Sequence, residues 1–228
     1  MSSRFIGGDA MHVLLLLAIT VAIFLLVLLW IRWRQRAMVE LSSDAGLTLL
    51  PSAPIRDVLP YASSFKSLPK NANTATNSIQ KDGVTLAFDA TVGHEARATV
   101  LVYAWHYPEL GVCIKPKTIL SRVAHRFNPA LDLNFEHDKT FSRRYAIEAL
   151  NQASVAEFFD DDTRLQFRQT MMRGYTLEIR LNTAILHRYG RRLGASNLPR
   201  VHREGQRLID GLATRAAALG LENKQMTS

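Results

Sequence analysis

The chain has 228 residues, of which 47% are apolar and 21% charged, a composition typical of a folded rather than a disordered protein. Its single cysteine, Cys113, excludes an internal disulfide and a zinc site built from cysteines. The formal net charge of +8 indicates an anionic partner, of which a membrane surface and nucleic acid are the main classes.

The first element is an apolar segment, residues 12–31 (HVLLLLAITVAIFLLVLLWI), which contains no Asp, Glu, Lys or Arg. As a helix it would be about 30 Å long, the thickness of a bilayer's hydrocarbon core. A cleaved signal peptide is the main alternative, but the segment is long and no small-x-small cleavage site follows it. The sequence therefore predicts a retained transmembrane helix, with Trp30 and Trp33 at the membrane–water interface.

The flanks of this segment predict its orientation. Residues 1–11 form a short N-terminal tail with only Arg4 and Asp9 charged. Three arginines follow the span before any acidic residue: Arg32, Arg34 and Arg36. Because cationic flanks tend to stay in the cytoplasm, we expect a single-pass protein of a bacterial inner membrane, with its N-terminus outside and its soluble part cytoplasmic. Residues 32–45 contain no helix breaker and are expected to continue the span as a juxtamembrane helix.

Residues 46–220 are long enough for one soluble domain with its own core. We expect a strand at 47–50 that Pro51 ends, little regular structure at 51–69, and a polar loop at 71–78. Alternating apolar residues predict strands at 84–90 and 131–135 and a hairpin at 175–189, and apolar, β-branched or aromatic residues predict strands at 98–105, 112–114 and 145–150. The strand at 98–105 is apolar on both faces, which favours a central position in a sheet.

Helices are expected between and after these strands. One is expected at 116–127, a second begins at a capping box formed by Ser154 and Glu157, and a third is capped by Asp162 and Thr163. A fourth begins at Asn197, and residues 221–228 are expected to be frayed. Antiparallel hairpins with helices between them indicate an α+β fold: one N-terminal transmembrane helix, then a single domain with a mainly antiparallel sheet and flanking helices.

Several loose motifs support this architecture. They are Pro108 with Val112-Cys113-Ile114-Lys115-Pro116, then Phe141-Ser142-Arg143-Arg144-Tyr145, then the hairpin that ends at Tyr189, together with residues 47–54. In these motifs the chain resembles an uncharacterised group of bacterial single-span membrane proteins with a cytoplasmic α+β domain. The group has no known activity, so the resemblance implies an architecture and a compartment only.

The positive charge is concentrated in the C-terminal third, where eleven arginines between residues 163 and 215 face only three acidic residues. For a domain tethered to a leaflet, the nearest partner for such a surface is anionic lipid headgroups. A solvated face with internal ion pairs is the alternative, and nucleic acid is not expected because no nucleic-acid-binding motif is present. The candidate contacts with the membrane surface or an anionic partner are Arg32, Arg34, Arg36, Arg191, Arg192, Arg200 and Arg203.

Catalytic motifs are not found. The sequence His94-Glu95 begins like a zinc-protease helix, but position 98 is Ala where a second His is needed. The densest ionisable cluster runs from Asp132 to Asp138 and includes Glu136 and His137, a set that could hold a metal or supply an acid–base pair. The same residues also fit the solvated face of a strand and its turn.

Three hypotheses follow. The first is a membrane-anchored, non-enzymatic binding or scaffold module without a cofactor, whose partners are the lipid bilayer, anionic headgroups and another membrane protein. The second is an accessory subunit of a larger membrane protein complex. The third is a metal-dependent hydrolase that uses the acidic cluster between Asp132 and Asp138. Arg143-Arg144, beside Tyr145, could also bind a carboxylate or phosphate.

Overall fold

A computed structural model describes most of the chain. The described residues are 6–44, 47–69, 71–92, 95–107, 110–117, 133, 135–171, 173–194 and 196–220. The helix expected at 116–127, most of the strand expected at 131–135 and the C-terminal residues 221–228 lie outside these ranges.

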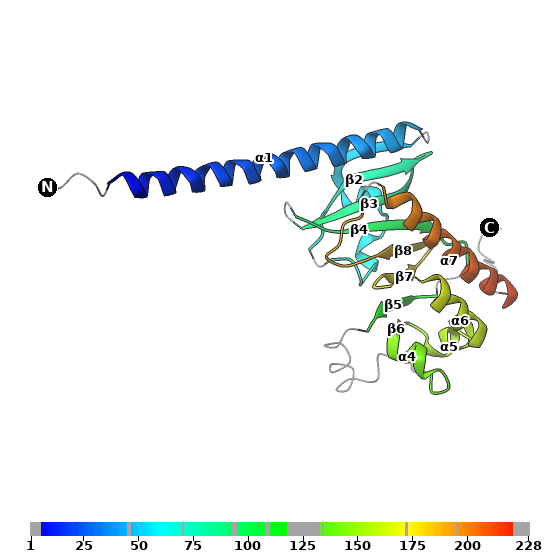
Figure 1. Ribbon diagram of the computed structural model, residues 1–228. Coiled ribbons are helices and arrows are strands. Elements are labelled where there is room, and N and C mark those ends of the chain that lie inside the picture. Colours follow the sequence, from blue (N-terminus) through cyan, green and yellow to red (C-terminus); the bar gives the residue numbers. More distant parts are fainter. Residues whose placement is uncertain are drawn as a thin grey trace.

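The N-terminal element is one long helix, α1 (Ile6–Asp44), which contains both the expected span and the expected juxtamembrane extension. Its segment Met11–Leu29 is the one helical stretch among the described residues that is long and apolar enough to cross a membrane. None of this segment is buried against the rest of the protein, and Figure 1 shows it projecting away from the folded domain. Large apolar side chains that no protein surface covers are suited to lipid, which supports a membrane location.

The folded domain is built on one antiparallel sheet of eight strands in the order β1-β2-β3-β4-β8-β7-β5-β6. Its strands are β1 (Thr48–Pro54), β2 (Thr74–Lys81), β3 (Val84–Val92), β4 (Glu95–Ala104), β5 (Val112–Pro116), β6 (Tyr145–Ala149), β7 (Thr176–Arg180) and β8 (Thr183–His187). Every neighbouring pair is antiparallel. The expected α+β fold with an antiparallel sheet and flanking helices is therefore confirmed.

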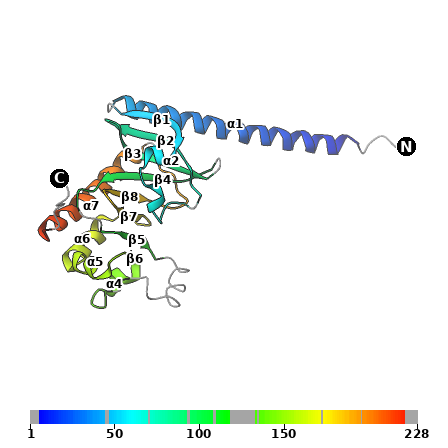
Figure 2. The same ribbon diagram turned by 180° about the vertical axis from the view of Figure 1, so that it is seen from behind.

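Both faces of the sheet are covered. On one face lie α4 (Lys139–Arg144), α5 (Gln152–Phe158), α6 (Asp161–Thr170) and α7 (Leu198–Ala218). On the other lies the connection between β1 and β2, with the short α2 (Ile55–Val58) and a 3₁₀ turn, η1 (Ala62–Ser64) (Figure 2). The central strand β4 contributes to both cores, with Leu101 and Tyr103 in the first and Val100 and Val102 in the second. The expected central position of this strand is confirmed.

Two expectations about the first strands are wrong. The polar stretch expected to be a loop at 71–78 contains most of β2, where small side chains such as Ala75 and Ser78 are fully buried. Pro51 does not end β1, which continues to Pro54. Because β1 is at the edge of the sheet, a proline nitrogen that points away from β2 breaks no inter-strand hydrogen bond.

The caps of α5 and α6 also differ from those expected. Asn151, not Ser154, caps α5, and its side chain accepts a hydrogen bond from the Ser154 amide at 3.2 Å. Asp160, two residues before the expected cap, accepts from the Thr163 amide at 2.8 Å. In both helices the cap lies three residues before the amide that it satisfies, the usual reach of such a side chain.

Helix α7 approaches the sheet closely at Gly205, which is buried. A Cβ atom at this position would overlap the hydroxyl of Tyr103, a buried side chain of β4. Gly211, on the same helix, would place its Cβ against the amide end of the exposed Gln166 side chain, which can move aside.

These two glycines predict opposite outcomes for the same substitution. Alanine is favoured over glycine within a helix by about 1 kcal/mol, so both Gly205→Ala and Gly211→Ala gain this amount. We expect Gly205→Ala to destabilise the domain by about 1–2 kcal/mol net, because overpacking outweighs that gain, and Gly211→Ala to leave stability unchanged or improve it. Denaturant unfolding of the detergent-solubilised full chain, followed by near-ultraviolet circular dichroism, measures both. Equal effects of the two variants would contradict close packing at Gly205.

Candidate functional site: a basic edge of the sheet

One edge of the domain gathers cationic side chains from separate parts of the chain. At this edge β5 ends at Pro116, β6 begins at Tyr145, β7 begins at Thr176 and β8 ends at His187. Cations stand just beyond these strand ends, and we call the set Lys117, Arg144, Arg173, Arg188 and Arg191 the basic edge. In Figures 1 and 2 these strand ends lie on the side of the domain toward which the apolar part of α1 extends.

The arginines of the basic edge are available to a partner. Arg144, Arg173, Arg188 and Arg191 make no ion pair with any carboxylate that the structure describes. Tyr189 lies between Arg188 and Arg191 in the chain and is 67% exposed. Amphipathic rings are enriched at membrane–water interfaces, and cations beside them favour anionic headgroups.

The arginines that the sequence proposed as contacts have different environments in the structure. Arg32 is exposed on α1, and the side chains of Arg34 and Arg36 lie outside the described part of that helix. Three of the remaining four are exposed: Arg191, Arg200 and Arg203. The fourth, Arg192, points into the domain, where its Nη2 lies 3.0 Å from Oδ2 of Asp89.

The pair between Arg192 and Asp89 is part of a buried polar group. Asp89 on β3 is 1% exposed and also accepts from Thr99 Oγ1 at 2.6 Å and from Asn77 Nδ2 at 3.0 Å. Thr99 Oγ1 in turn accepts from the Leu193 amide at 2.9 Å. These contacts fix the segment after β8 to Asp89 on β3 and to Thr99 in the middle of β4, and the neighbouring side chain of Arg191 stays exposed.

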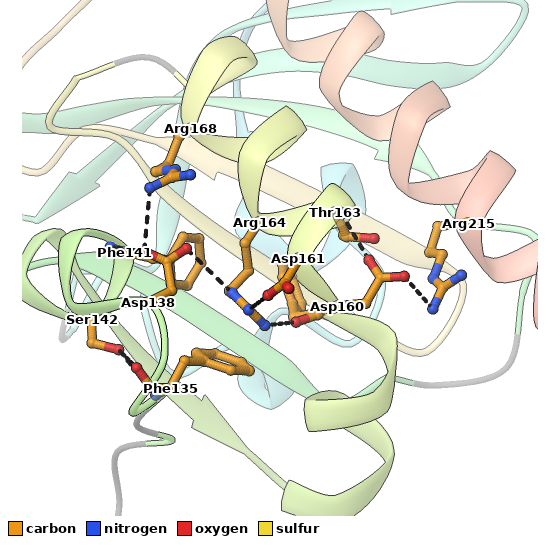
Figure 3. Close-up of polar contacts among 11 residues, drawn as sticks. Phe135, Asp138, Phe141, Ser142, Asp160, Asp161, Thr163, Arg164, Arg168 and Arg215 are labelled. Atoms are coloured by element: carbon orange, nitrogen blue, oxygen red, sulfur yellow. Dashed lines mark hydrogen bonds and ion pairs between the residues drawn. The ribbon is translucent and has the colours of Figure 1, made fainter.

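The residues of the acidic cluster proposed for metal catalysis also have different environments. Asp132 lies outside the described residues, and Glu136 and His137 are exposed. Asp138 is the N-cap of α4 and accepts from the Phe141 amide at 2.9 Å, from Arg164 Nε at 3.4 Å and from Arg168 Nη1 at 3.2 Å (Figure 3). Its carboxylate oxygens are thus occupied in joining α4 to α6.

Arg164 stands at the centre of this group of contacts (Figure 3). Its side chain is 6% exposed, and besides Asp138 it donates to Asp161 and to the carbonyl of Phe159, while its guanidinium lies 4.3 Å from the centroid of the Phe135 ring. Among the residues that the structure describes, no three His, Cys, Asp or Glu side chains stand close enough to hold a metal ion. The contacts of Arg164 and Asp138 are suited to holding the helices together.

A further ion pair extends this group of contacts to α7. Asp160, the cap of α6, lies 2.6 Å from Arg215 Nη2 (Figure 3). Partial burial would raise the pKa of Asp160, but its hydrogen bonds to Thr163 and the nearby charges of Arg215 and Arg164 lower the pKa below its ordinary value. The carboxylate is therefore ionised at neutral pH, and α6 and α7 are held together by charge as well as by packing.

The opposite face of the sheet carries another buried polar group. Glu178 on β7 is fully buried and accepts from the amides of Lys66 and Ser67 at 3.0 and 2.8 Å and from Arg180 Nε at 3.1 Å. His187 Nε2 lies 3.0 Å from Ser67 Oγ, and burial lowers the pKa of this histidine to about 4. The neutral histidine and the charged Glu178 together attach the connection between β1 and β2 to the sheet.

Cys113 is fully buried on β5. Burial, with the charge of Glu178 nearby, raises the pKa of the thiol far above its ordinary value. It is therefore protonated and shielded, which does not suit a nucleophile.

Comparison with known proteins gives one informative likeness. No protein-family model matches the chain, and no curated protein matches it. Among solved structures, the fold resembles the crystal structure of the mycobacterial trehalose monomycolate transport factor A, TtfA, with a TM-score of 0.50 and 12% identity. The match covers 79% of this chain and 93% of that one. At this identity the likeness concerns the fold alone, and it agrees with the α+β architecture.

The sequence did not predict that these cations converge at the basic edge. The sequence singled out the pair Arg143-Arg144 as a possible anion contact, but Lys117, Arg173 and Arg188 were not selected. They come from three different strand ends, and only the order of strands in the sheet brings them together.

Adjacent arginines with different environments provide a stability test. Removing one partner of a fully buried ion pair costs about 3–5 kcal/mol. Arg192 keeps 31% of its side-chain surface exposed, so we expect Arg192→Ala to destabilise the domain by about 2 kcal/mol. The matched variant Arg191→Ala removes an exposed cation that forms no ion pair with a described carboxylate, and it is expected to change stability by less than about 0.5 kcal/mol. Chemical denaturation of the full chain in detergent compares them, and similar values for both would show that the pair with Asp89 contributes little.

Proposed function

We propose that the chain is a membrane-anchored, non-enzymatic binding module whose basic edge lies against the anionic headgroups of the leaflet from which α1 emerges. The observation that carries the proposal is that Arg188 and Arg191, with the exposed Tyr189 between them, stand at the edge of the sheet toward which the segment Met11–Leu29 extends. Each cation close to an anionic surface contributes about 1 kcal/mol. Because the helix already holds the domain at the membrane, weak contacts of this size are enough to orient it.

The leaflet follows from the charged flanks. Arg32, Arg34 and Arg36 after the span favour a cytoplasmic domain and an N-terminus outside, in the inner membrane of a bacterium. The cytoplasmic leaflet also carries the negative surface potential that a basic edge requires. The orientation of the span and the charge of the domain thus favour the same side of the membrane.

A second candidate is an accessory subunit of a larger membrane protein complex. The observation that favours it is the similar fold of a protein described as a transport factor. An edge oriented against the membrane would leave the helical face, with α5, α6 and α7, accessible to another membrane protein. This role is compatible with the first, because one edge would contact lipid and another face would contact the partner.

The proposed orientation can be tested with two single-cysteine labels. The native Cys113 is fully buried, so an exposed engineered cysteine can be labelled selectively. Tyr189→Cys places a fluorophore at the basic edge, and Val84→Cys places one at the start of β3, at the opposite ends of the strands. The native side chains are similarly exposed, at 67% and 59%, which makes the two positions a matched pair.

The full chain is reconstituted in nanodiscs containing a lipid with a nitroxide on its headgroup. We expect strong quenching of the label at position 189, weak quenching at position 84, and an increase at 189 alone when phosphatidylglycerol is added. Equal quenching at the two positions, or no response to the anionic lipid, would show that the basic edge does not face the headgroups.

The proposed topology predicts the behaviour of a C-terminal reporter. An enzyme that is active only outside the cytoplasm, fused after Ser228, should be inactive in a bacterial host, whereas one that is active only inside should function. The same reporters fused to an exported protein serve as the control. Activity of the external reporter on this chain would reverse the assignment.

A further inference from the structure

A basic cleft of about 580 Å³ opens at the basic edge, where β5 and β6 meet the end of α6. Its walls contain four cations and, among the described residues, no acidic side chain. The side chains that matter are Lys117, Arg144, Tyr145, Arg168 and Arg173. This volume is in the range of small-molecule sites and is larger than a single phosphate requires.

Two of the cations are held in place by the protein itself. Lys117 Nζ donates to the carbonyl of Ser142 at 2.8 Å, and Arg168 Nη1 donates to Asp138 Oδ1 at 3.2 Å. A guanidinium has five N–H donors, so the contact of Arg168 with Asp138 leaves donors for a ligand. Asp138, which the sequence placed in a catalytic cluster, thus fixes one wall of the cleft.

The other two cations are exposed. Arg144 and Arg173 form no ion pair with a described carboxylate, while the backbone of Arg144 is fixed because its carbonyl accepts from the Lys117 amide at 2.8 Å. A fifth cation lies beside them: Arg188 Nε is 3.2 Å from the position that a Cβ on Gly174 would occupy. Gly174 lines the cleft and has φ +82°, a conformation that glycine adopts without strain. Because glycine has no side chain, this position also leaves room for Arg188.

Helix capping does not explain this arrangement. Arg144 is in the last turn of α4 and Arg168 in the last turn of α6, where cations interact favourably with helix carbonyls. Arg173 and Arg188 belong to neither helix. Like charges so close together repel one another, and an anion between them relieves that repulsion.

We propose that this cleft binds a phosphate group, carried either by an anionic lipid headgroup or by a soluble phosphorylated molecule. Phosphate has more acceptor oxygens than a carboxylate, and guanidinium groups bind it through paired N–H donors. The phenol of Tyr145, in the wall of the cleft, adds a neutral donor. The lipid form of this inference rests on the proposed function, because it requires the basic edge to face the leaflet, whereas a soluble phosphate reaches the cleft in either orientation.

The test compares Arg144→Gln/Arg173→Gln with Arg56→Gln/Arg207→Gln, which removes the same charge from exposed positions outside the basic edge. A third variant, Arg144→Lys/Arg173→Lys, keeps the charge but loses the paired donors. All are full-length chains in a maltoside detergent, which contains no phosphate. Because the substituted side chains are exposed, each variant should fold, and circular dichroism and the unfolding midpoint verify this.

Two probes separate the sources of phosphate. Calorimetric titration with inorganic phosphate and with glycerol 1-phosphate measures binding of soluble ligands, and native mass spectrometry with added phosphatidylglycerol or a neutral lipid measures retention of a headgroup. We expect the glutamine pair to bind at least roughly tenfold more weakly than the wild type, the lysine pair to bind with intermediate affinity, and the control pair to match the wild type.

Each outcome decides between the alternatives. Loss of binding in the phosphatidylglycerol assay alone identifies a headgroup site, and loss in the titration identifies a site for soluble phosphate. Binding that is equal in the wild type and the glutamine pair, or undetectable in the wild type with every probe, overturns the cleft. If the cleft fails while the label at position 189 is still quenched, the proposed orientation stands. If the titration succeeds while that label is not quenched, the cleft stands without the membrane contact.

Discussion

The buried carboxylate of Asp89 is the constraint that positions the segment after β8, which carries Arg188 and Arg191 of the basic edge. A charge that is 1% exposed in the middle of a sheet is costly unless a cation and further hydrogen bonds satisfy it. No residue of β3 itself provides the cation, so Arg192 supplies it from the segment after β8. Because Arg192 points inward, the backbone on either side of it is held against Thr99 of β4, and Tyr189 and Arg191 are exposed at the surface.

A second buried carboxylate is satisfied in a similar way on the opposite face of the sheet. Glu178 is buried on β7 and recruits the amides of Lys66 and Ser67, more than a hundred residues earlier in the chain. A buried carboxylate therefore attaches each covering segment to the sheet, in one case through a guanidinium and in the other through backbone donors. Such contacts are destabilising when half formed, which favours one unique position for each segment.

Sequence patterns predicted the elements in which side-chain alternation reflects burial. The strands β3, β4, β7 and β8 and the helix α7 were predicted because large apolar residues recur on a face that the core covers. The strand β2 was missed because the buried residues within the expected loop, Ala75 and Ser78, are small, so their burial results from the layers packed over the strand. The caps at Asn151 and Asp160 were misplaced by a few residues, since several neighbouring side chains could make the same hydrogen bond.

Only the composition of the candidate site, an excess of arginine, could be predicted from the sequence. The excess of arginine in the C-terminal third is visible in the sequence, but the sequence does not distinguish Arg191 from Arg192, which share every local property. Their roles separate only because the carboxylate of Asp89, about a hundred residues away, lies beneath one of them. Likewise Lys117, Arg144 and Arg173 become neighbours because β5 pairs with both β6 and β7, a pairing that no local pattern encodes. Where a charge excess arises from a few separated strand ends, the order of strands in the sheet decides which cations come together at one surface.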